Sequence, residues 1–285
     1  MVRARGRRGA ARAALLVPLL AAACGGSGSG SNNASAPGIT ATTVSIGSTQ
    51  PLTGPAALGY SEIAPASNAY FAYVNAHGGV FGRTIKYTYL DDGYVVSNTP
   101  TQTRKLVLQD NVFAIFGALG TPTHLSVVDY LNSEKIPDVF VSSGCNCWNN
   151  PSKYPYTFGW QPDYTIEGKI LGQYIKQTYA GMKVGYFAQG PNDEFGDDGI
   201  AGLNDELQGS NVTVVSPPQY YAPTAAGAMA VKNNIAALQS AGVQVIAGFS
   251  VPLFTAVAEA SAAALNYHPI FVVSTVGSDP PTLSK

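Results

Sequence analysis

The stretch VFAIFGALGTPTH, from Val112 to His124, decides the fold that we expect for this chain. Its first five residues are all apolar, and a run this short is typical of a fully buried strand rather than a helix. The run ends at Gly117, and small residues then lead to Thr121 and Pro122. Thr is a favoured N-cap and Pro is favoured at the first helical position, so we expect a helix that is capped by Thr121.

This strand–turn–helix unit predicts a ligand-binding position. In an open α/β sheet, ligands bind at the carboxyl ends of the strands, and the N-terminus of a helix attracts anions. The unit places the hydroxyl of Thr121 and several unpaired backbone N–H groups at such a strand end. An ordinary βα turn that holds no ligand is the alternative at this stage.

Strands and helices alternate along the rest of the sequence. In the first half, strands are expected at 43–48, 83–90, 138–142 and 156–159, and helices at 60–77, 97–110 and 121–132. In the second half, helices are expected at 164–179, 197–207, 226–241 and 253–265, and strands at 183–187, 211–215, 243–248 and 270–274. Because alternating βαβ units form parallel sheets with helices on both faces, we expect an α/β protein of two doubly wound parallel-sheet lobes. The lobes are expected at 39–162 and 163–285, joined by a hinge.

Composition excludes one class of partner. The chain has 285 residues, of which 46% are hydrophobic, which is ample for one large or two medium domains. Five of its 16 basic residues are arginines that precede the first acidic residue, Glu62, and the rest of the chain carries 11 basic against 17 acidic groups. Such an acidic body offers no electrostatic footprint for nucleic acid.

The N-terminus resembles the signal of a bacterial lipoprotein. A basic segment precedes an apolar stretch at 13–23 that is too short to span a bilayer, and Cys24 follows it. The resemblance implies that 1–24 is a signal peptide and that Cys24 carries a lipid. Residues 25–38, rich in Gly, Ser and Asn, are expected to form a flexible linker. We expect an extracytoplasmic protein anchored to the outer face of the cell membrane, and plain secretion is the alternative.

Several segments together resemble the type I periplasmic binding proteins, and most of all the branched-chain amino acid (leucine/isoleucine/valine) receptors of ABC transporters. In the first half these segments are VSIGSTQPLTGPAALG (44–59), NAHGGVFGR (75–83), LDD (90–92) and FGALGTPT (116–123). In the second half they are VGYFAQGPNDEFGDDG (184–199) and VQVIAGFSVPLFTAVAEA (243–260). The resemblance implies a clamp of two lobes that closes on a small zwitterion and delivers it to an ABC permease, whose ATPase supplies the energy.

The resemblance also implies the ligand contacts. The carboxylate of the ligand is expected against hydroxyl and N–H groups of Thr121, Thr123, Ser142, Ser143 and Gly144. On the second lobe Phe195 stands where close relatives have Tyr, so ring stacking remains and a hydroxyl contact is lost. A second aromatic contact is expected near 250–252, where the only rings nearby are Phe249 and Phe254.

Two further residues complete the expected contacts. Thr275 is the nearest match to the Glu that holds the ammonium group in relatives that bind amino acids, and Asp279 is the only carboxylate beside it. This departure leaves a neutral or purely anionic small molecule open as the ligand. Tyr60, just after a Gly-Pro turn, is expected either over the mouth of the cleft or packed on its own lobe.

The cysteines and histidines suggest structure rather than catalysis. Outside the cytoplasm the nearby thiols of Cys145 and Cys147 are usually oxidised, so we expect a structural disulfide; a metal pair and free thiols are the alternatives. His124 is expected to be an ordinary polar helix residue. Asp91 and Asp92 are interpreted as a loop-capping pair, because a metal site needs further ligands. No metal and no cofactor are expected.

The sequence contains no recognisable catalytic motif that would indicate an enzyme. The segment from Gly248 to Pro252 lacks the second Gly of a G-x-S-x-G elbow, and no phosphate-binding Gly-rich loop occurs. The expected function is therefore a solute-binding receptor for a small polar ligand, such as an amino acid or a related amide or carboxylate. The alternatives are a sensory module that signals to a membrane partner and a hydrolase. In the family the chain crosses back to the first lobe after the last strand found here, so we expect a C-terminally incomplete clamp with an uncovered apolar edge.

Overall fold

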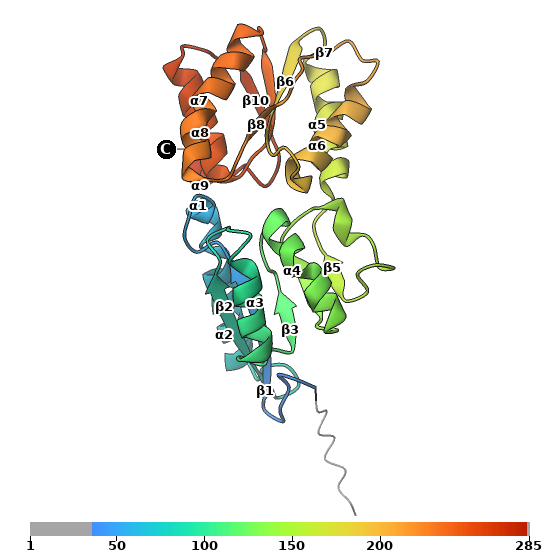
Figure 1. Cartoon of the computed structure of the whole chain (residues 1–285), viewed down its shortest axis with the longest axis vertical. Coiled ribbons are helices and arrows are strands. Elements are labelled where there is room, and N and C mark those ends of the chain that lie inside the picture. Colours follow the sequence, from blue (N-terminus) through green and yellow to red (C-terminus); the bar gives the residue numbers. More distant parts are fainter. Residues whose placement is uncertain (1–35, 284–285) are drawn as a thin grey trace, which may run out of the picture. The chain divides into compact units, whose positions relative to one another are not determined.

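The computed structural model describes residues 36–283 (Figure 1). The expected signal peptide, with Cys24, and most of the expected linker lie outside the described residues. Across 36–283, no helix has the length and apolar character that crossing a membrane requires.

The first sheet has five parallel strands in the order β2-β1-β3-β4-β5. Its strands are β1 (Thr43–Gln50), β2 (Thr84–Asp91), β3 (Ala114–Phe116), β4 (Asp138–Val141) and β5 (Thr157–Gly159). The helical segments around it are α1 (Ala57–Tyr60), α2 (Ile63–Ala76), α3 (Thr99–Leu108), α4 (Thr121–Ser133) and the 3₁₀ turn η1 (Asn146–Trp148). The apolar run at 112–116 thus forms β3, the central strand. Successive strands are added on one side of β1 and then, from β3 on, on its other side. Ligands bind at such a switch point, between β1 and β3.

Helices cover both faces of the first sheet. On one face α3 and α4 bury an aliphatic cluster against β3, which includes Leu106, Ile115 and Leu131. On the other face α2 places Phe71 against the rings of Tyr87 and Phe116, with centroids 5.2 and 5.3 Å apart. Side chains that alternate along each strand therefore pack against a helix layer on each face of the sheet, as in a doubly wound fold.

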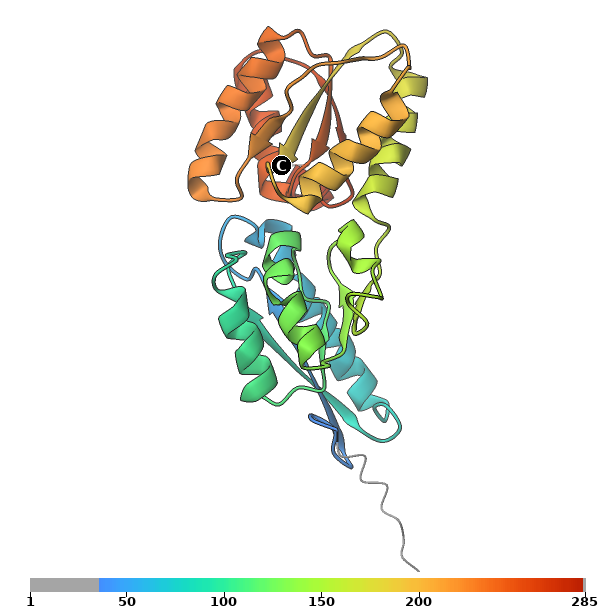
Figure 2. The same ribbon diagram turned by 45° about the vertical axis from the view of Figure 1, so that its right-hand side comes forward.

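The second sheet is also parallel and five-stranded. Its order is β10-β9-β6-β7, with β8 paired to the far end of β6. The strands are β6 (Lys183–Gln189), β7 (Thr213–Val214), β8 (Gln219–Tyr221), β9 (Val245–Phe249) and β10 (Ile270–Val273). The helices are α5 (Tyr164–Thr178), α6 (Glu194–Leu207), α7 (Ala225–Ser240), α8 (Pro252–Ala264) and α9 (Pro280–Leu283). Figures 1 and 2 show α5 and α6 on one side of this sheet and α7 on the other.

Glycines let α5 and α6 pack unusually closely. A Cβ on Gly168 would lie 2.3 Å from the carbonyl oxygen of Gly199, and one on Gly202 would lie 2.1 Å from that of Thr165. No larger residue fits at these two crossing points. The close crossing fixes the start of α5 beside the first turns of α6, and both helices contribute to the site described below.

The structure confirms two doubly wound parallel sheets and corrects several local predictions. The expected helix 60–77 starts later than predicted, because Tyr60 ends the short α1, residues 61 and 62 form a turn, and α2 begins at Ile63. The N-cap of α4 is Gly120, with φ 112°, so Thr121 is the first helical residue and not the cap. α6 begins at Glu194 rather than 197, because the Asp193 side chain accepts the N–H of Phe195. The short strand β8 was not expected.

Candidate ligand-binding site

A cavity of about 700 Å³ lies where the strand ends of the two sheets meet. Its walls come from the segments that follow β2, β3, β4, β5, β6, β9 and β10, together with α1, α2 and α5. Both sheets therefore contribute their carboxyl ends, the position at which open parallel sheets bind ligands. The lining residues are Tyr60, Ile63, Tyr94, Leu119, Gly120, Thr121, Ser142, Trp160, Gln161, Pro162, Tyr164, Glu167, Ile170, Leu171, Phe195, Val251, Thr275 and Val276.

On the first lobe, the start of α4 forms a hydroxyl-bearing wall. Thr121 is 1% exposed, and its Oγ1 lies 2.7 Å from Oγ of Ser143. Ser143 in turn accepts the N–H of Cys145 at 3.2 Å. No side chain caps this helix, so the N–H groups of its first turn have no capping partner, and the helix starts at the cavity lining. Dipoles of this kind interact favourably with negative charge.

On the second lobe, Phe195 forms an aromatic wall. It is 1% exposed, and its ring centroid lies 4.8 Å from that of Tyr164 and 5.9 Å from that of Phe249. Asp193 holds the Phe195 backbone by accepting its N–H at 3.0 Å. The expected second aromatic contact near 250–252 is absent from the lining, because Phe249 and Phe254 are fully buried in the core and Val251 faces the cavity instead.

Tyrosines surround the cavity as neutral groups. The hydroxyl of Tyr60 donates to the carbonyl oxygen of Val276 at 2.9 Å, which joins the two lobes. The hydroxyl of Tyr94 accepts from the side-chain amide of Gln189 at 3.3 Å, also across the lobes. Burial raises the pKa of Tyr60, Tyr94 and Tyr164 above the ordinary value, so these phenols stay protonated at neutral pH.

Glu167, in the first turn of α5, is the one ionisable acid or base other than tyrosine in the described lining. Its Oε1 accepts the N–H of Thr275 at 2.6 Å. Thr275 is the residue that the resemblance matches to the ammonium-binding Glu of relatives that bind amino acids. The fold places the carboxylate of Glu167, 108 positions earlier in the chain, beside Thr275, and no local motif predicts this contact.

Five of the expected contacts line the cavity, and three lie behind its wall. Those in the lining are Tyr60, Thr121, Ser142, Phe195 and Thr275. Thr123 is fully buried and donates to the Leu119 carbonyl oxygen at 2.9 Å. Ser143 shares a hydrogen bond with Thr121. Gly144 packs against Pro162 and Tyr164, and the carbonyl oxygen of Gly144 accepts the N–H of Tyr164 at 2.7 Å. Sequence reasoning missed Tyr94, Trp160, Tyr164 and Glu167.

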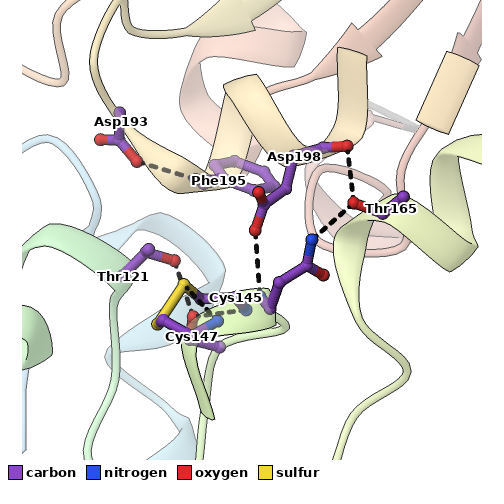
Figure 3. The surroundings of a disulfide bond; sticks show 9 residues. Thr121, Cys145, Cys147, Thr165, Asp193, Phe195 and Asp198 are labelled. Carbon is purple, nitrogen blue, oxygen red and sulfur yellow. Dashed lines mark hydrogen bonds between the residues drawn. A yellow bond between two sulfur atoms is a disulfide. The ribbon is translucent and has the colours of Figure 1, made fainter. Parts of the chain in front are cut away.

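A disulfide joins Cys145 and Cys147, whose Cα atoms are 5.1 Å apart. Asn146, between them, bonds to the second lobe (Figure 3): its N–H donates to Asp198 Oδ2 at 3.0 Å and its side-chain amide donates to Thr165 Oγ1 at 2.7 Å. Burial raises the pKa of Asp198, and the Asn146 N–H opposes that shift. The loop therefore connects the wall at Thr121, through Ser143, to the start of α5 and α6.

His124 is not the ordinary polar helix residue that the sequence suggested. It is 1% exposed, and its Nε2 lies 2.7 Å from Oδ2 of Asp138, which also accepts the hydroxyl of Thr157 at 2.9 Å. The pair ties α4 to β4 and β5 beneath the cavity. In contrast, Asp91 and Asp92 cap loops as expected: Asp91 accepts three backbone N–H groups, and Asp92 accepts the N–H of Tyr94. No cluster of His, Cys and acidic side chains that could hold a metal occurs within 36–283.

A profile of the periplasmic binding protein family matches residues 43–285. The chain belongs to that family. The match covers both sheets and confirms the resemblance drawn from the sequence segments. Members of the periplasmic binding protein family are binding proteins rather than enzymes. A comparison with curated protein sequences found no match.

Solved structures of ABC-transporter binding proteins share the fold. The fatty acid ABC transporter substrate-binding protein from Thermomonospora curvata superposes with a TM-score of 0.73 at 22% identity, over 88% of this chain and 62% of that chain. A branched chain amino acid ABC transporter from Thermus thermophilus with bound valine gives 0.73 at 18%, over 86% and 62%. The solute binding protein of an ABC transporter from Rhodopseudomonas palustris BisB5, in complex with 3,4-dihydroxy benzoic acid, gives 0.64 at 19%, over 79% and 59%. The chain therefore spans about three fifths of the length of these proteins, and the likeness at such identities shows the fold alone.

Proposed function

We propose that this periplasmic binding protein captures a small solute between its two lobes and delivers it to an ABC permease. The observation that carries the proposal is the cavity of about 700 Å³ walled by strand ends of both sheets. A solute in that cavity touches Thr121 and Ser142 on one side and Phe195 and Thr275 on the other. A ligand that contacts both lobes favours the closed state by the difference in its affinity for the closed and open forms.

The proposed setting is extracytoplasmic. The N-terminal segment supports it, because a basic region, a short apolar stretch and Cys24 are typical of a lipoprotein signal. We propose that Cys24 holds the protein on the outer face of the cell membrane and that the partners are a permease and its ATPase. Mass spectrometry of the protein purified from membranes tests the anchor: a lipid on Cys24 is expected, and an unmodified secreted chain would contradict it.

A thermal-shift screen against amino acids, amides, small carboxylates, aromatic solutes and polyols tests solute binding. A ligand that binds only the folded state stabilises it by about 2.7 kcal/mol at a concentration of 100 Kd, which raises the unfolding midpoint. At least one class is expected to raise the midpoint in a concentration-dependent way. If no class does so, and calorimetry with the same compounds shows no heat of binding, the proposed function is wrong.

A further inference from the structure

The walls of the cavity are mainly apolar and aromatic. Aliphatic side chains and the rings of Trp160, Tyr164 and Phe195 make up most of the lining, and they come from both lobes. A volume of about 700 Å³ lies within the range of about 300–1,000 Å³ that accommodates drug-sized ligands. A small polar solute leaves much of this apolar wall without partner atoms, whereas a ring-bearing solute fills it.

The charge in the lining is negative. Glu167 is flanked there by protonated tyrosines, and the described lining contains no Lys, Arg or His. Glu167 is half-buried, and only its Oε1 is engaged, by the N–H of Thr275. Among residues 36–283 no hydrogen bond occupies Oε2, so this oxygen is available to a donor in the cavity.

The opposite wall offers dipoles but no full positive charge. The N–H groups at the start of α4 favour a negative group only weakly, and the Thr121 hydroxyl is already shared with Ser143. A solute that carries only negative charge is therefore attracted weakly by the N–H dipoles of α4 at one wall. At the other wall it is repelled by the carboxylate of Glu167, which has no positively charged neighbour in the described lining. An amine or a zwitterion has a partner at Glu167, and the zwitterion also has one at α4.

We infer that the solute has a ring-sized apolar body and carries an ammonium group that faces Glu167, and that solutes with only a carboxylate charge are rejected. The inference rests on the proposed function. It narrows the small polar ligand expected from the sequence, and it makes Glu167 a residue that determines specificity.

Four probes separate the two parts of the inference, with affinities measured by calorimetry on the whole chain. L-Phenylalanine has a ring and both charges, phenethylamine has a ring and only the ammonium, 3-phenylpropionate has a ring and only the carboxylate, and L-valine has both charges without a ring. The first two are expected to bind at least about tenfold more tightly than 3-phenylpropionate, because only they offer an ammonium group to the Glu167 carboxylate. They are also expected to bind more tightly than L-valine, because a ring buries more apolar surface in the cavity. Tighter binding of 3-phenylpropionate would overturn the charge assignment, and tighter binding of valine would overturn the size assignment.

Glu167→Gln tests the assigned residue. The amide keeps an oxygen for the Thr275 N–H and removes the charge, so the preference for phenethylamine over 3-phenylpropionate is expected to fall about tenfold while the preference for a ring persists. The matched control is Glu134→Gln, the same change at the exposed C-terminal end of α4, which is expected to leave both preferences unchanged. An unchanged charge preference in Glu167→Gln would overturn the inference. Binding of other solutes in the wider screen would still support the proposed function, whereas no binding by any solute would reject both.

Discussion

At the scale of single residues, Thr121 joins the cavity wall to the layer behind it. Its side chain is buried, lines the cavity and shares a hydrogen bond of 2.7 Å with Ser143. A hydroxyl in this position can orient the wall and also meet a ligand. The nearby Thr123 is equally buried, but its hydroxyl donates a hydrogen bond to the Leu119 carbonyl oxygen. The two threonines therefore form a natural pair for comparison.

Thr121→Val is expected to weaken solute binding about tenfold and to lower the free energy of unfolding by about 1 kcal/mol, because one buried hydrogen bond is lost. The measurements are calorimetry with the tightest solute of the screen and urea denaturation. Thr123→Val removes a comparable bond away from the cavity, so a similar loss of stability with unchanged affinity is expected. Weaker binding in Thr123→Val than in Thr121→Val would contradict the assignment of the wall.

Residue-level chemistry also marks what the sequence could predict of the site. Thr121 could be found because a short strand followed by small residues and a helix start is a local pattern, and Phe195 because of the resemblance to the family. Glu167 could not be found from the sequence, because its contact with Thr275 spans 108 positions. The His124–Asp138 pair was missed for the same reason: each residue is unremarkable alone, and the two meet only when α4 packs on β4.

At the scale of elements, the loop between β1 and α1 depends on Asp91 at the end of β2. Its Oδ1 accepts the N–H groups of Leu52, Thr53 and Gly93, and its Oδ2 accepts the Thr53 hydroxyl at 2.6 Å. Burial alone would raise the pKa of Asp91, but these hydrogen bonds outweigh it and lower the pKa below the ordinary value. The loop leads directly into α1, which places Tyr60 at the cavity.

Asp91→Asn is expected to lower the free energy of unfolding at pH 7 by about 1–2 kcal/mol, because bonds to an ionised acceptor are the stronger ones. A carboxyl whose folded pKa lies below its unfolded value stabilises the fold above the unfolded pKa, about 3.9, and loses that contribution as the pH falls through the folded pKa. Urea denaturation from pH 7 to pH 3.5 is therefore expected to show the difference between wild type and variant shrinking. Asp129→Asn, an exposed residue of α4, is the control. A difference independent of pH would contradict this assignment.

Most strands and helices could be predicted, because buried strands appear in the sequence as short apolar runs and helices as apolar residues at helical spacing. Their ends were less predictable. α4 begins one residue earlier than predicted, because the N-cap is Gly120 and not Thr121. Gly120 has φ 112°, a backbone conformation that is costly for a residue with a Cβ, such as Thr. The helix expected from residue 60 begins only at Ile63, because Tyr60 belongs to the short α1 and a turn at residues 61 and 62 separates it from α2. The three-residue strand β8 follows two prolines and has too little pattern to detect.

At the scale of the described molecule, two contacts between the lobes can be tested by substitution, in addition to the hydrogen bond from Gln189 to Tyr94. One is the Tyr60 hydroxyl on the carbonyl oxygen of Val276, and the other is Asn146 on Asp198 and Thr165. Tyr60 and Val276 line the volume that a solute would fill, and Thr165 is the neighbour of Tyr164, which also lines it. Each therefore stabilises the arrangement in which the two lobes grip one ligand, without requiring direct contact with it.

Tyr60→Phe is expected to keep the ring in the lining and to remove the bond between the lobes. Solute affinity is expected to fall about three- to tenfold, since a typical hydrogen bond contributes about 0.5–1.5 kcal/mol. The loss is expected mainly in the dissociation rate, measured by surface plasmon resonance, because changes within one interface act mostly there. An unchanged dissociation rate would show that this bond does not hold the closed state.

Asn146→Ala removes the amide bond to Thr165 and leaves the backbone N–H that meets Asp198. Because the Cys145–Cys147 disulfide fixes Asn146 between two linked residues, the loop keeps its place and only the contact between the lobes is weakened. We expect faster solute dissociation by about three- to tenfold with little change in the midpoint of thermal unfolding.

Asn149→Ala is the control for that variant, because Asn149 is exposed in the same loop and its side chain makes no hydrogen bond within residues 36–283. If both variants release solute at the wild-type rate, the loop serves the first lobe alone. If Asn146→Ala releases faster, opening the disulfide with a dithiol reductant is expected to do so too, because a loop without its covalent link holds Asn146 against the second lobe less firmly. The effect of reduction is then expected to vanish in Asn146→Ala, since the two changes act through one contact.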